Sequence, residues 1–134
     1  MAQTNSSLQR WEPIFLSLLR IVVGLLLLEH GTQKLFHYPT PDHRMAVHGL
    51  TPLLTVAAWI ELIGGLLLIL GLFTRMVAFV VAGEMAVAYF IAHAPGSIFP
   101  IRNHGELAVA LCFVFLYIAV AGPGKLSVDA MWRG

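Results

Sequence analysis

The sequence predicts an all-α integral membrane protein, a four-helix bundle whose helices run antiparallel in the order up-down-up-down. Hydrophobic residues make up 58% of the 134 residues and charged residues only 11%, whereas a soluble domain carries about 25% charged residues. The apolar residues gather in four long runs, and each run contains or begins near one glutamate. The net charge of +1 and the absence of any Lys/Arg cluster exclude a nucleic-acid-binding protein.

The first run predicts a span over about residues 13–36. Pro13 is placed to open a helix, and about 20 residues cross a bilayer. Residues 1–12 form a polar N-terminal segment, and no small-residue cleavage site follows the run. We therefore expect a retained first span and not a removed signal peptide.

The second and third runs predict neighbouring antiparallel spans. Thr51 followed by Pro52 is a helix-start signal, which gives a span over about 51–73. Only a short connection separates it from the next span, about 75–94, so the two spans must form a hairpin. A small-residue stripe in the third span suits close helix packing in lipid, and it consists of Ala78, Ala82 and Ala86.

The fourth run predicts a span over about 104–121. Asn103 and Glu106 have the spacing of a capping box, and Gly122-Pro123-Gly124 is a strong stop signal. Residues 13–122 thus form one transmembrane bundle, and residues 123–134 form a short interfacial tail.

The distribution of basic residues predicts the orientation. Four spans place both termini on one side of the membrane. That side carries Arg10, Arg20, Arg75, Lys125 and Arg133, and the other side carries Lys34, Arg44 and Arg102. The excess favours an inner-membrane protein with both termini in the cytoplasm.

Counting residues from the helix ends places the polar groups in one half of the bundle. The glutamates and histidines concerned are Glu29, Glu61, Glu84, Glu106, His30, His37, His43, His48, His93 and His104. All of them lie between the midplane and the face opposite the termini, or in the loops of that face. This segregation predicts a polar chamber that opens outward.

Glu61 and Glu84 are the sharpest catalytic candidates. Their depths match and their helices are neighbours, so one of the two carboxylates would hold a proton in a low dielectric. Such a pair suits proton transfer coupled to redox chemistry, or ligation of a hard cation. A structural hydrogen bond, or an ion pair with Arg20, is the alternative.

The end of the first span supplies further candidates. Glu29 and His30 can both flank the bundle axis as catalytic groups, and Gln33 and Lys34 lie on their respective faces as substrate-binding groups. The alternative makes Glu29 a structural partner of Lys34 or of an arginine on another helix.

Tyr89 and His93 share a face of the third span and are candidate substrate-binding residues, as is Glu106 if it is more than a cap. A haem held by His30 and His93, or a metal bound through histidine and glutamate, also remains open. No glutamate has a histidine three residues later, the spacing typical of carboxylate-bridged metal pairs. Cys112 is the single cysteine, which excludes an intramolecular dithiol.

Several stretches resemble the DoxX family of small four-span membrane proteins. They are HGTQKLF at 30–36, ELIGGLLLILGLFTR at 61–75, AGEMAVAYF at 82–90, and NHGELA and AGPGKLSVD within 103–129. Members of this family are commonly described as membrane oxidoreductase subunits. The resemblance implies a role near quinone-linked or thiol redox chemistry. The matching polar positions are His30, Gln33, Lys34, Glu61, Asn103 and Glu106.

The sequence thus favours a membrane oxidoreductase or a quinone-linked redox subunit. Its expected partners are the lipid bilayer, a quinone and a redox-enzyme subunit, and a homo-oligomer is open. A non-enzymatic chaperone or scaffold for a redox enzyme is the first alternative. A metal or small-molecule binding or transport protein is the second.

Overall fold

The structure is a computed structural model that describes residues 6–40 and 50–133. The predictions that involve His43, Arg44 and His48 lie outside these residues. Every regular element in the described part is helical, which confirms the all-α prediction. The helices are α1 (Ser6–Gln9), α2 (Glu12–Phe36), α3 (Pro52–Leu70), α4 (Thr74–Ala88), the π-helix η1 (Tyr89–His93), α5 (Pro100–Asn103), α6 (Glu106–Ala121) and α7 (Val128–Trp132).

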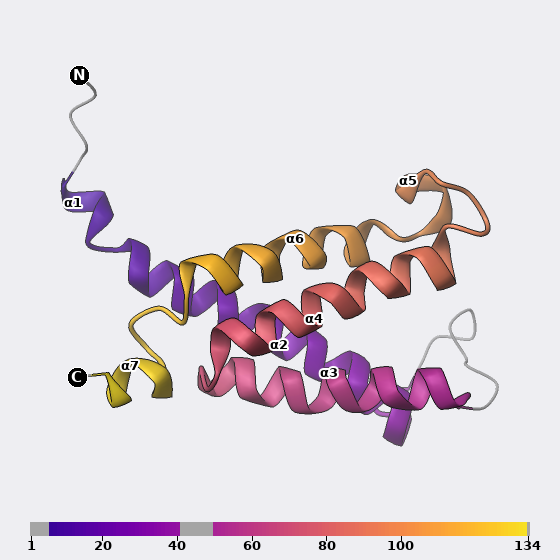
Figure 1. Cartoon of the computed structure of the whole chain (residues 1–134), viewed down its shortest axis with the longest axis horizontal. Coiled ribbons are helices and arrows are strands. Elements are labelled where there is room, and N and C mark those ends of the chain that lie inside the picture. The colour runs from indigo at the N-terminus through magenta and orange to yellow at the C-terminus, as the bar shows by residue number, and fades with distance from the viewer. Residues whose placement is uncertain (1–5, 41–49, 134) are drawn as a thin grey trace.

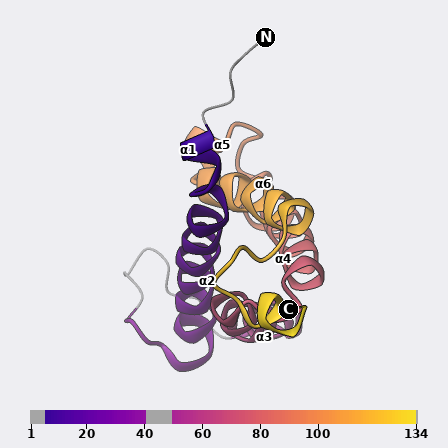
Figure 2. The same cartoon turned by 90° about the vertical axis from the view of Figure 1, so that its left-hand side faces the viewer.

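The long helices α2, α3, α4 and α6 run in alternating directions (Figure 1). One end of the bundle carries the start of α2, the turn between α3 and α4, and α7; we call it the tail end. The opposite end carries the segment from η1 to α6, and we call it the loop end. In the end-on view, the segment between α6 and α7 crosses the tail end from α6 past α2 to α3 (Figure 2).

Most of the predicted helix boundaries agree with the structure. Thr51 caps α3, because its side chain accepts a hydrogen bond from the Leu54 N–H at 3.3 Å. Gly71 ends α3 with φ 69°, and Gly122 ends α6. Pro13 lies in the first turn of α2, as predicted.

The capping-box prediction for the fourth span is wrong. Asn103 is the last residue of the short helix α5, and His104 follows in the left-handed region with φ 59°. The Asn103 carboxamide oxygen accepts from the Gly105 N–H at 2.7 Å, while Glu106 is the first residue of α6 and is exposed. The fourth helix therefore begins two residues later than predicted.

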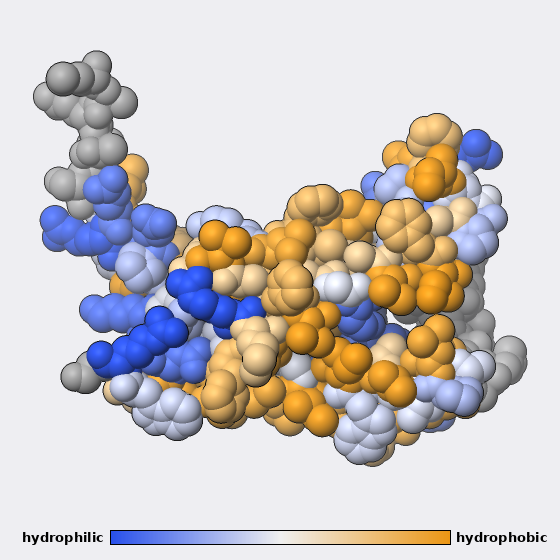
Figure 3. All heavy atoms as spheres, viewed as in Figure 1, coloured by the Kyte–Doolittle hydropathy of each residue, from blue (hydrophilic) through white to orange (hydrophobic). Residues whose placement is uncertain are grey.

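Three of the described helical stretches are long and apolar enough to cross a membrane: Ser7–Phe36, Pro52–Leu70 and Thr74–His93. Glu106–Ala121 is a shorter apolar helix. Its 16 residues correspond to about 24 Å, against about 30 Å for a bilayer core. Hydrophobic side chains cover most of the visible middle of the bundle, whereas hydrophilic ones gather at the tail end (Figure 3).

The helices pack as two close pairs, α2 with α3 and α4 with α6. Glycines set the first pair. A Cβ added to Gly31 would lie 2.6 Å from the Leu62 nitrogen, and one added to Gly65 would lie 2.7 Å from the Leu28 nitrogen. Only glycine permits this approach of the two backbones, so the glycines at positions 31 and 65 specify the pairing of α2 with α3.

The pair α4 and α6 packs through smaller and larger side chains that interlock. Ala78 and Ala82 of the predicted stripe are buried, and Ala86 is half-buried. Phe115 and Ile118 of α6 are completely buried in the same core. The stripe therefore has the packing role that the sequence predicts.

The C-terminal segment is more than an interfacial tail, because it is bonded to two helices of the tail end, α2 and α4. The Lys125 N–H donates to the Pro13 carbonyl at 3.1 Å, and the Leu126 N–H donates to Ser17 Oγ at 3.0 Å. The Asp129 carboxylate accepts from the N–H groups of Phe73 at 2.9 Å and Thr74 at 2.8 Å. These contacts hold residues 122–133 across the bundle.

Asp129 makes the attachment of the tail sensitive to acid. Burial acts to raise the pKa of Asp129, but hydrogen bonds from Thr74 and Phe73 and the charge of Arg133 lower it below its ordinary value. A carboxylate with a lowered folded-state pKa stabilises the fold above its unfolded pKa, about 3.9. This stabilisation is lost as the pH falls through the folded-state pKa.

We therefore expect the melting temperature of wild type to fall more steeply than that of Asp129→Asn as the pH is lowered from about 5 to about 2. The measurement is thermal unfolding in detergent across this range. Equal pH dependence of the two proteins would show that Asp129 does not link the tail to the helices.

Candidate functional site

The structure pairs Glu61 with a lysine and not with the second carboxylate. Lys34 Nζ donates to Glu61 Oε1 at 2.7 Å and to Oε2 at 2.8 Å. The Glu61 side chain is 3% exposed and the Lys34 side chain is 23% exposed. A nearly buried carboxylate thus meets an ammonium group that still reaches the surface, the arrangement that makes a buried charge tolerable.

Among the described residues, Glu61 bonds to Lys34, and no hydrogen bond joins it to Glu84. Gly31 and Gly65 let α2 pack directly against α3, and this close approach places Lys34 beside Glu61. Lys34 also does not pair with Glu29, and Arg20 pairs with neither predicted glutamate: its Nη2 donates to the Leu126 carbonyl at 2.5 Å.

Glu84 nonetheless belongs to the same electrostatic cluster. The charges of Glu61 and Lys34 both act on it, as the matched depths on α3 and α4 predict. Its Oε2 atom is buried, and no described residue forms a hydrogen bond with that atom. Lys34, Glu61 and Glu84 form what we call the polar cluster, in which Lys34–Glu61 is a fixed pair and Glu84 has spare hydrogen-bonding capacity.

An apolar groove runs along the outside of α3 and α4 near the polar cluster. Its volume is about 470 Å³. Its lining residues are Thr55, Val56, Trp59, Ile60, Ile63, Gly64, Leu67, Met76, Val77, Val80 and Val81. Gly64 lies three residues after Glu61 and Val81 three residues before Glu84, so the groove passes within about one helical turn of both carboxylates. Hydrophilic atoms are visible at the bottom of the hollow between α3 and α4 (Figure 3).

The other candidates from the first span lie outside this cluster. Glu29 is exposed, and His30 is half-buried one turn before Lys34. Gln33 donates through Nε2 to the Pro39 carbonyl at 3.3 Å, which ties down the chain after α2. The structure therefore brings together only Lys34 from the predicted 29–34 group with the two central glutamates.

Tyr89 and His93 belong to a different network at the loop end. Tyr89 is buried, and its hydroxyl donates to the Ile98 carbonyl at 2.6 Å and accepts from Asn103 Nδ2 at 3.3 Å. His93 Nδ1 lies 3.0 Å from the Asn103 carbonyl oxygen. These contacts hold the segment between η1 and α6. Both residues lie in the π-helix η1, whose wider turn differs from the α-helical geometry that we assumed when placing them on one face.

Asn103 is the residue whose role the sequence reasoning missed. Its carboxamide donates to the Ser97 carbonyl at 2.6 Å as well as to Tyr89. An asparagine two residues before a glycine, in a loop rich in proline, was a turn signal that could have suggested this role. Among the described His, Cys, Asp and Glu side chains, no group of three or more could hold a metal ion.

The apolar helices, the hydrophobic outer surface and the buried ion pair define a multi-pass membrane protein. The DoxX family model matches residues 15–94, and the chain belongs to the DoxX family. An uncharacterized protein of Haemophilus influenzae is 43% identical over 127 residues, which cover 92% of this chain and 95% of the relative. No solved structure matches the chain.

Proposed function

We propose that the chain is a quinone-linked subunit of a membrane oxidoreductase, and that the polar cluster binds the quinone headgroup. The observation that carries the proposal is the combination of a fixed Lys34–Glu61 pair with Glu84, whose buried Oε2 has no described hydrogen-bond partner. A carbonyl compound needs a donor and a proton source, and these groups supply both.

Each member of the polar cluster has a role in this proposal. An ammonium group has three N–H donors, and two of those of Lys34 bond to Glu61. The third N–H donates to one carbonyl oxygen of the quinone. Glu61 positions Lys34 and balances its charge. Glu84 exchanges a proton with the second oxygen. Reduction to the quinol takes up two electrons, which come from a redox partner subunit, and two protons, one on each oxygen. Glu84 supplies the proton of the second oxygen and the Lys34 ammonium that of the first, and both groups are reprotonated from water.

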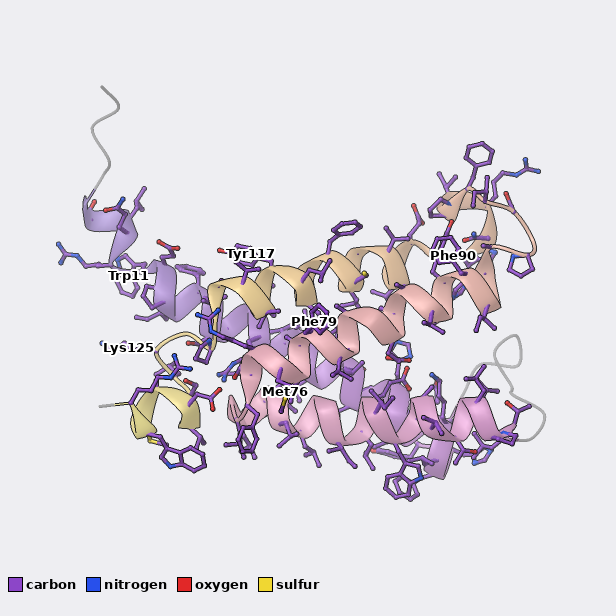
Figure 4. The ribbon with its side chains drawn as sticks, in the orientation of Figure 1. Trp11, Met76, Phe79, Phe90, Tyr117 and Lys125 are labelled. Carbon is purple, nitrogen blue, oxygen red and sulfur yellow. The ribbon has the colours of Figure 1, made fainter. Side chains whose placement is uncertain are left out.

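The surroundings of the cluster support a lipid-soluble substrate. The groove between α3 and α4 is apolar and reaches the outer surface of the bundle. Exposed apolar side chains such as Met76 and Phe79 of α4 lie along the same face (Figure 4). A hydrophobic tail could therefore remain in the bilayer while the headgroup enters between the helices.

We place the protein in the inner membrane with the tail end in the cytoplasm and with α6 as a fourth span. Arg10, Arg20, Arg75, Lys125 and Arg133 are all at the tail end, which fits the positive-inside rule. The short α6 can be accommodated because the bilayer thins locally around a short span.

Substitution within the polar cluster should separate binding from proton transfer. We expect Lys34→Met to weaken binding of a short-chain benzoquinone by about tenfold or more, since a hydrogen bond to a charged group is worth about 1.5–3 kcal/mol. Glu84→Gln should retain binding but lower quinone reduction by about 100-fold or more, the usual effect of losing a general acid. The measurements are quinone titration and quinol formation in proteoliposomes.

Glu106→Gln is the matched control, because Glu106 is an exposed glutamate at the start of α6. It should behave as wild type in both measurements. Quinone binding that is absent from wild type, or that is the same in all three variants, would exclude the proposed role of the cluster.

A non-enzymatic scaffold is the second candidate, and Glu29 favours it. Glu29 is exposed on α2 seven residues before the helix end at Phe36, and a carboxylate facing lipid at such a depth is costly. A partner protein or a second copy that covers it would remove this cost. A wild-type protein that binds no quinone but co-purifies with a stoichiometric partner would support this candidate.

A further inference from the structure

We infer that water-soluble species and protons reach the polar cluster only from the loop end, and that residues 122–133 act as a plug that closes the tail end. The inference concerns access to the site and does not depend on quinone chemistry. Three successive barriers lie between the cluster and the tail end, whereas the described residues of the loop end include neither a buried arginine nor a segment bonded across the bundle like the tail.

The first barrier is an apolar layer. Leu27 of α2, Leu68 of α3, and Phe115 and Ile118 of α6 are all 0% exposed, and Val81 of α4 is 1% exposed. Every long helix contributes to this layer, which belongs to one continuous core. A close-packed layer of aliphatic and aromatic side chains leaves no polar partner for a water molecule.

The second barrier is a buried positive charge. Arg20 is 0% exposed, and among the described residues neither its Nε nor its Nη1 has a hydrogen-bond partner. Its one hydrogen bond to a described residue runs from Nη2 to the Leu126 carbonyl of the tail. A guanidinium group held on a pathway repels protons and other cations, as arginines do in water-selective pores.

The third barrier is the tail itself. It reaches α2 through Lys125 and Leu126, and it reaches the start of α4 through Asp129. Two glycines with positive φ permit this fit: a Cβ on Gly71 would overlap the Arg20 guanidinium, and one on Gly124 would lie 2.3 Å from Ser17 Oγ. Packing this close indicates that residues 122–133 close the tail end of the bundle as a plug and are not a loosely attached terminus.

The loop end differs in the features that matter for access. The Lys34 side chain remains 23% exposed although it bonds to the nearly buried Glu61. A charged side chain that joins the surface to the cluster provides a route for water and protons at this end.

Thiol labelling from each side of the membrane tests the inference. Glu84→Cys is made in a Cys112→Ala background, so that residue 84 carries the single thiol. A membrane-impermeant charged thiol reagent is applied to right-side-out and to inside-out vesicles. We expect modification from the side of the loop end and none from the side of the tail end. Modification from the tail side would overturn the inference.

Three control positions in the same background calibrate the reagent. Gly83→Cys lies beside residue 84 but on the lipid-facing surface, where no atom lies within 4 Å of its added Cβ, so it should stay unmodified from both sides. Glu106→Cys should react from the loop side and Lys125→Cys from the tail side, since both positions are exposed.

Loss of the plug should open the second side. Deletion of residues 125–134 in the Glu84→Cys protein should produce labelling from the tail side, while labelling from the loop side shows that the bundle is still folded. If the deletion abolishes labelling from both sides, Asp129→Ala is the milder variant to use in its place. Folded variants of both kinds that still exclude the reagent on the tail side would refute the role of residues 122–133 as a plug.

Discussion

Replacing Gly31 by alanine should destabilise the bundle more than any other single-methyl addition on α2. The added Cβ would lie 2.6 Å from the Leu62 nitrogen and 2.9 Å from its Cα. Both atoms belong to the backbone of α3, so no side-chain rotation relieves the overlap and the two helices must separate. Overpacking of this kind costs about 1–3 kcal/mol, and separation would also strain the Lys34–Glu61 bond. The measurement is unfolding in mixed micelles with increasing denaturing detergent.

Gly83→Ala is the control for this prediction, because it makes the same chemical change on α4 with no neighbouring atom within 4 Å. It should be neutral or slightly stabilising, since alanine favours a helix over glycine by about 1 kcal/mol. Equal stability of the two variants would contradict the close approach of α2 to α3.

Removal of Lys34 is expected to have the second large effect. Lys34→Met would leave Glu61, which is 3% exposed, as a buried carboxylate without its counterion. Breaking a buried ion pair in this way costs about 3 kcal/mol or more. Glu61→Leu should cost less, because the Lys34 side chain is 23% exposed and can extend toward water.

A double-mutant cycle measures the coupling between the two residues. The protein that carries both Lys34→Met and Glu61→Leu should be close in stability to Glu61→Leu alone, because no buried charge is left unpaired. Additive losses from the two single variants would mean that the residues do not form the pair seen in the structure.

The helices could be predicted from the sequence because local signals specify where they begin and end. Thr51 and Pro52 mark the start of α3, and Gly71 and Gly122 mark the ends of α3 and α6. Composition predicts the membrane environment, and the matched depth of Glu61 and Glu84 follows from counting residues along antiparallel helices. The helix ends, the membrane environment and the depths of the two glutamates depend on composition and on residues close in the sequence, so they could be predicted before the structure was known.

The partner of Glu61 depends on which helix faces it, and this choice is made by packing. Gly24, Gly31 and Gly65 permit α2 to approach α3, but a glycine also ends helices and forms turns, so its role is ambiguous in the sequence alone. The spacing of seven residues between Gly24 and Gly31 is the signal that could have indicated a helix seam.

The roles of Asn103 and of the tail are non-local for the same reason. Asn103 bonds to Tyr89, which is 14 residues away, and Asp129 bonds to Thr74, which is 55 residues away. The resemblance to the DoxX family included NHGELA and AGPGKLSVD, but nothing in these motifs says that their polar residues fasten the two ends of the bundle.

Covalent mapping of a bound quinone tests the central claim most directly. A photoreactive benzoquinone is illuminated with the reconstituted protein, and the modified peptides are identified by mass spectrometry. The account predicts that the label lies on α3 and α4 around Glu61 and Glu84, that excess unlabelled quinone abolishes it, and that Lys34→Met lowers it. Labelling confined to other surfaces, or labelling that Lys34→Met leaves unchanged, would contradict a quinone site at the polar cluster.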